Sequence, residues 1–174
     1  MIERLLRAVA SRWFRLVLVL LVLLSLQTTL FGAMRPFGYA IQILAIFVAC
    51  AGVSVDLRIG VLAGLTAGFM YDAVLATPLG VSALVFAMVG ALGATLVQPF
   101  RDPPWWLRVV AVSIAAASGE VLMPLMKSVV GLDGWLSVRV GAVAAVTLSG
   151  GLVLAWPLLA LSRWTLQEKI SLGR

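Results

Sequence analysis

Residues 59–99 read IGVLAGLTAGFMYDAVLATPLGVSALVFAMVGALGATLVQP, and they contain the clearest structural signal in the sequence. Two apolar runs, 59–76 and 80–99, flank a short turn at 77–79. Each run is close to the roughly 20 residues that a helix needs to cross a bilayer. A connection of this length keeps the two helices adjacent and antiparallel. The stretch therefore predicts a hairpin of two membrane-spanning helices.

The same pattern extends over the rest of the chain. Hydrophobic residues make up 63% of the sequence and charged residues 11%, which excludes a water-soluble fold. Further apolar runs lie at 16–33, 39–55, 107–130 and 138–161. The prediction is a single transmembrane domain over residues 1–174: an all-α, polytopic membrane protein with about six spanning helices. Short tails at 1–15 and 162–174 are expected to be cytoplasmic.

The basic residues predict the orientation. If the spans alternate in direction, ten Lys and Arg residues fall on the side of the N-terminus and three on the other side. Positive residues are enriched in cytoplasmic segments, so both termini are predicted to be cytoplasmic. The formal net charge of +6 comes from these span ends, not from a basic stripe among aromatic residues, which argues against nucleic-acid binding.

Few residue types suited to catalysis are present. Histidine is absent, and the single cysteine, Cys50, lies within an apolar run. The commonest general base and the commonest metal ligand are therefore missing. We expect no catalytic site, no cofactor site and no metal site.

A strip of glycines marks the third predicted span. Gly60, Gly64 and Gly68 recur at a spacing of four, and Asp72 is the next residue on the same helix ridge. Such a strip allows a second helix to approach backbone to backbone. The occupant is open: another helix of this chain, a second copy of the chain, or a different protein. The compact turn Pro78, Leu79 and Gly80 follows.

Glu120 is the most deeply placed charge, near the middle of the fifth predicted span. A carboxylate at that depth faces other helices or a wet cavity, because exposure to lipid costs several kcal/mol. One interpretation is a proton relay or a polar contact to a substrate. The other is structural: a carboxyl, neutral or paired with Lys127 or Arg139, that fixes helices in register.

The glycine strip and the turn together resemble a known family. The pattern Gly64-x-x-x-Gly68-x-x-x-Asp72, then Pro78-Leu79-Gly80, Ala83-Leu84, Gly90 and Gly93, resembles the rod shape-determining protein MreD family. The run LQTTL at 26–30 is similar to the polar notch that closes the first helix of that family. The resemblance implies a fold like that of the S component of energy-coupling-factor transporters.

The resemblance also implies a function and partners. It implies a non-enzymatic subunit of the bacterial cell-elongation (rod) complex in the inner membrane, which binds MreC and helps control cell shape and lateral peptidoglycan synthesis. The MreB filament and the RodA and penicillin-binding synthases are the further partners implied. The residues expected at the helix-packing or partner interface are Gly60, Gly64, Gly68, Asp72, Pro78, Leu79 and Gly80.

A second hypothesis follows from the S-component likeness. The chain would then be a substrate-binding subunit of a transporter for a small molecule or lipid precursor. Glu120, Gln27 or Gln42 would line a pocket near the middle of the membrane. A hydrophilic substrate asks for several convergent polar groups, and the spans offer few.

Overall fold

The apolar runs form six helices in the computed structural model, which describes residues 11–33, 41–75, 79–129, 131 and 138–166. Every regular element in these ranges is a helix, which confirms the all-α prediction. The helices are α2 (Arg12–Ala33), α3 (Ile43–Ser54), α4 (Leu57–Leu75), α5 (Val81–Val97), α6 (Trp105–Val129) and α7 (Val138–Leu166).

The helices differ in length. Four of them, α2, α4, α6 and α7, are long and apolar enough to cross a membrane. The other two, α3 with 12 residues and α5 with 17, are shorter than the predicted runs 39–55 and 80–99. At 1.5 Å per residue, α3 is only about 18 Å long, well short of a hydrocarbon core of roughly 30 Å.

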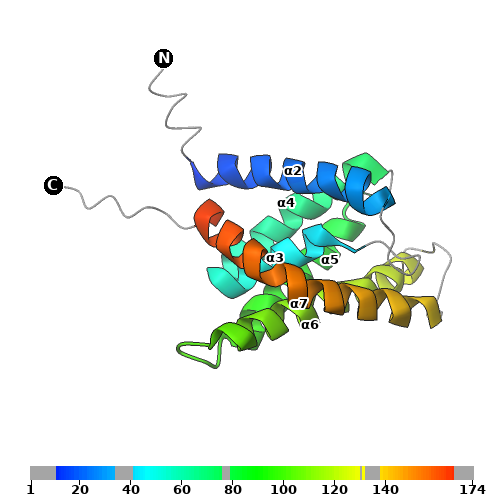
Figure 1. The fold of residues 1–174 in the computed structure, drawn as a ribbon. Helices are drawn as coiled ribbons and strands as arrows, with labels where there is room; N and C mark the ends of the chain where they lie inside the picture. Colours follow the sequence, from blue (N-terminus) through cyan, green and yellow to red (C-terminus); the bar gives the residue numbers. More distant parts are fainter. Residues whose placement is uncertain (1–10, 34–40, 76–78, 130, 132–137, 167–174) are drawn as a thin grey trace, which may run out of the picture.

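The short helix α3 lies at the centre of the bundle. Every residue from Ile43 to Val53 is buried, so no side of the helix faces outward. It packs against each of the other five helices (Figure 1). Because protein surrounds α3 on all sides, the bilayer thickness does not dictate its length.

The start of α2 and the end of α7 lie side by side at one end of the bundle (Figure 1). The Arg15 guanidinium donates to the Trp164 carbonyl at 3.0 Å and lies over the Trp164 ring. Both helices extend beyond the predicted spans, α2 starting at Arg12 and α7 ending at Leu166. Parts of the expected tails 1–15 and 162–174 are therefore helical.

Candidate functional site

The glycine strip of α4 is covered by α5 of the same chain. A Cβ atom added at Gly64 would collide with the backbone of Phe86, and one added at Gly68 would collide with the backbone of Ala83. At Gly60 an added Cβ would lie 2.8 Å from the Gly90 carbonyl oxygen. The sequence left open which helix fills the glycine strip. In the structure it is another helix of the same chain, α5.

We call the contact that Gly60, Gly64 and Gly68 of α4 make with α5 the glycine seam. Helix α3 also takes part in it, because a Cβ atom at Gly60 would lie 2.7 Å from the Gly52 Cα. The obstacles are backbone atoms, which cannot rotate away as a flexible side chain can. Any side chain on the seam must therefore push α4 away from α5 or α3.

Asp72 caps the start of α5 from the neighbouring helix. Its Oδ2 accepts the Gly80 N–H at 2.8 Å, and its Oδ1 accepts the Ser82 N–H at 3.3 Å. The first N–H groups of a helix have no partner within the helix, and leaving them bare in a membrane costs several kcal/mol. Asp72 is 1% exposed, so its carboxylate faces the interior of the hairpin and not a partner outside it.

The turn before α5 has one position that requires glycine and one exposed side chain. Gly80 has φ = +103°, a conformation that L side chains rarely adopt. Leu79 beside it is 77% exposed, the most exposed large apolar side chain in the described residues. Pro78, the remaining residue of the predicted turn, lies outside the described residues.

Gln27 gives α3 the same kind of cap that Asp72 gives α5. Its Oε1 accepts the Leu44 N–H at 3.1 Å, across from α2 to the first turn of α3. Gln27 is 8% exposed. Both short helices therefore begin under a side chain supplied by a neighbouring helix.

Glu120 lies in a group of buried and half-buried polar side chains contributed by five parts of the chain. The Gln42 amide donates to its Oε2 at 3.3 Å, and the Thr147 hydroxyl donates to its Oε1 at 3.0 Å. Tyr71 of α4 interacts electrostatically with Glu120 and lies close to Gln27. We call Gln27, Gln42, Tyr71, Glu120 and Thr147 the polar layer.

The polar layer changes the expected surroundings of Glu120. The structure gives the carboxylate an amide and a hydroxyl partner, and not Lys127. The Arg139 side chain lies outside the described side chains. The structure places Gln42 against Glu120 and Gln27 against the first turn of α3. That these residues line a substrate pocket stays a prediction. The roles of proton relay and substrate contact stay predictions.

Sequence reasoning did not foresee two features of this region. Thr147 was not singled out, because a lone hydroxyl in an apolar helix usually bonds its own backbone. Gln27 was noted as part of a notch, but the N–H that it caps belongs to Leu44, on another helix. The sequence signal for a role of Gln27 is a polar amide side chain within an otherwise apolar run.

The described residues offer little for metal chemistry. No three His, Cys, Asp or Glu side chains among them lie close enough to hold a metal ion. Cys50 is buried on α3, with its Sγ 3.9 Å from the Ala155 carbonyl oxygen.

The Asp72 cap and the glycine seam lie within the stretch, residues 60–93, whose sequence resembles the MreD family. The family model described as rod shape-determining protein MreD matches residues 7–148, which is most of the chain. The chain belongs to the MreD family. The match includes the whole glycine seam, both cap residues and all of the polar layer.

Other comparisons add nothing to the MreD assignment. No curated protein and no solved structure matches the chain. The likeness to S components of energy-coupling-factor transporters therefore stays a prediction. Membership of the MreD family, together with the four long apolar helices, makes this chain a rod shape-determining membrane protein.

Proposed function

We propose that this MreD-family chain is a non-enzymatic scaffold of the rod complex in the bacterial inner membrane. It binds an MreC-like membrane protein and, through it, works with the MreB filament and the RodA and penicillin-binding synthases in lateral peptidoglycan synthesis. The observation that carries the proposal is the family match over residues 7–148.

The glycine seam is not the surface offered to that partner, because α5 already covers it. Its role in the proposal is internal: Gly60, Gly64, Gly68 and Asp72 hold α4 and α5 together as one rigid hairpin. The hairpin in turn exposes Leu79 at its turn and presents the outward face of α5, which includes Leu84, to the bilayer. Variants of the seam would then disturb partner binding by displacing α5.

The partner surface that we propose is a groove between α5 and α6. It has a volume of about 570 Å³ and is lined by Met88, Ala91, Leu92, Thr95, Ser118, Val121 and Leu122. Thr95 and Ser118 donate to their own helix backbones, at the Leu92 and Ala115 carbonyls, so the groove presents an apolar wall.

The occupant that we propose is the single spanning helix of the MreC-like protein. Ala91 and Ser118 are small, which allows close approach, and helices associate in lipid through such packing. The 25-residue helix α6 gives the groove a wall of full membrane thickness. Leu79 lies at the turn between α4 and α5, the helix that forms the other wall of the groove.

Site-specific photocrosslinking in native membranes tests this. A photoreactive residue at Met88 or Val121 is expected to capture the MreC-like protein. The matched control is Val153 on α7, which is 75% exposed but lies outside the groove. Equal capture from Val153, or no capture from the groove by a chain present at normal amount, would refute the groove as the interface.

The alternative is an S-component-like carrier, favoured by the convergence of Gln27, Gln42 and Glu120 in the polar layer. A carrier would hold a small molecule there. Native mass spectrometry of the purified chain separates the two functions: a stoichiometric small ligand that is lost in Glu120→Ala but not in Met88→Ala would favour the carrier. A scaffold is expected to show no such ligand.

A further inference from the structure

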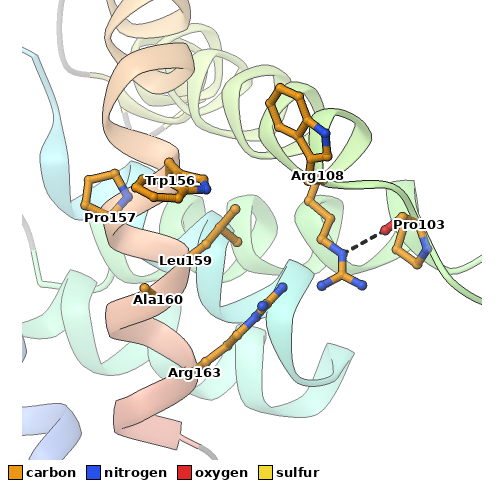
Figure 2. Close-up of a pocket in the computed structure, with 8 residues that line it drawn as sticks. Pro103, Arg108, Trp156, Pro157, Leu159, Ala160 and Arg163 are labelled. Atoms are coloured by element: carbon orange, nitrogen blue, oxygen red, sulfur yellow. Dashed lines mark hydrogen bonds between the residues drawn. The ribbon is translucent and has the colours of Figure 1, made fainter.

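A second cavity lies between the start of α6 and the last third of α7. It has a volume of about 530 Å³, within the range of ligand sites. It is lined by Pro103, Trp105, Arg108, Trp156, Pro157, Leu159, Ala160 and Arg163. Figure 2 shows Arg108 and Arg163 extending into the space between the two helices.

Among the described residues that line this cavity, two carry guanidinium groups and none carries a carboxylate. Arg108 donates its Nε–H back to the Pro103 carbonyl at 3.0 Å, which fixes the group at the start of α6 (Figure 2). Neither arginine forms an ion pair with any residue that the structure describes. Two like charges on one cavity are stabilised by an anion, and guanidinium groups bind phosphate in bidentate fashion.

The rest of the lining is apolar and points to an amphiphile. Trp156 lies seven residues before Arg163, roughly 10 Å farther along α7 at 1.5 Å per residue. Trp105 and Trp156 are 72% and 74% exposed, so the cavity opens to the side. A charged end and an apolar end separated along the helix axis match a phospholipid headgroup and the start of its acyl chains.

We propose that this cavity binds the phosphate headgroup of an anionic phospholipid. Arg108 and Arg163 hold the phosphate, while Trp156, Pro157 and Leu159 contact the glycerol and the first acyl carbons. Basic pockets between spanning helices on the cytoplasmic side are suited to such headgroups. A free phosphate would use the same arginines but would gain nothing from the apolar wall.

Lipid retention by the purified full-length chain tests the proposal. In zwitterionic micelles we expect native mass spectrometry to show dioleoylphosphatidylglycerol retained in preference to dioleoylphosphatidylcholine. Arg108→Gln and Arg163→Gln should each weaken that retention about fivefold, and the double variant about 25-fold. The matched control is Arg101→Gln, an exposed arginine that does not line this cavity and should leave retention unchanged.

Three results would overturn the proposal. One is equal retention of the two lipids, and another is equal loss in Arg101→Gln. The third is displacement of the lipid by inorganic phosphate at matched concentration, which would assign the cavity to a free anion.

A second variant guards against misfolding of the arginine variants. Ala160→Leu keeps both arginines and narrows the apolar part of the cavity at an exposed position. It should lower phosphatidylglycerol retention without changing the unfolding temperature. Wild-type retention by folded Ala160→Leu would also overturn the proposal.

Discussion

Asp72 and Gln27 are single residues on which the starts of α5 and α3 depend. Asp72→Ala removes the acceptor for the Gly80 and Ser82 N–H groups, and we expect it to lower the free energy of unfolding by about 1–3 kcal/mol. Asp72→Asn keeps one acceptor oxygen, so its free energy of unfolding should lie between those of the wild type and Asp72→Ala. Thermal unfolding in detergent measures the difference. The control is Asp102→Ala, at an exposed position in the connection before α6; equal effects at the two sites would contradict the cap.

Glu120 is the acceptor at the centre of the polar layer. Glu120→Ala leaves the Gln42 amide and the Thr147 hydroxyl without this partner, at an expected cost of about 2 kcal/mol. Glu120→Gln retains an acceptor oxygen and should cost less than half as much. Unfolding of the two variants in the same detergent gives the comparison, and an equal or larger loss in Glu120→Gln would contradict the role of the acceptor oxygens.

Gly64 determines how closely two elements, α4 and α5, can pack. Gly64→Ala places a methyl group against the Phe86 backbone, and we expect a loss of about 1–3 kcal/mol in stability. Gly141→Ala on α7 is the matched control, because nothing lies within 4 Å of its added Cβ. If Gly64→Ala and Gly141→Ala both leave the unfolding temperature unchanged, α4 and α5 do not pack as closely as described.

The helices and the adjacency of α4 and α5 could be predicted from the sequence, but most of the contacts between helices could not. Hydrophobic runs predicted all six elements, with ends that differ by a few residues, because apolar length is a local property. The spacing of Gly60, Gly64 and Gly68 placed them on one face, but which helix fills that face depends on the whole bundle. The same holds for Gln27, whose partner Leu44 comes 17 positions later.

The whole molecule has two ends that should face opposite sides of the membrane. Leu79, at the turn between α4 and α5, is expected outside, and Arg101, before α6, inside. The only native cysteine, Cys50, is buried and should not interfere with labelling. A membrane-impermeant maleimide should therefore label Leu79→Cys in intact bacteria and Arg101→Cys only after permeabilisation. The opposite pattern would invert the predicted topology.

The enclosed helix α3 has a consequence for biogenesis. A segment of 12 helical residues is too short to be released into lipid by itself as the nascent chain leaves the translocon. Four of the five helices that shield it, α4 to α7, are synthesised after it, and α6 and α7 come last. Insertion of the centre of this protein must therefore wait for its C-terminal half, and chains interrupted before α6 should be substrates for membrane proteases.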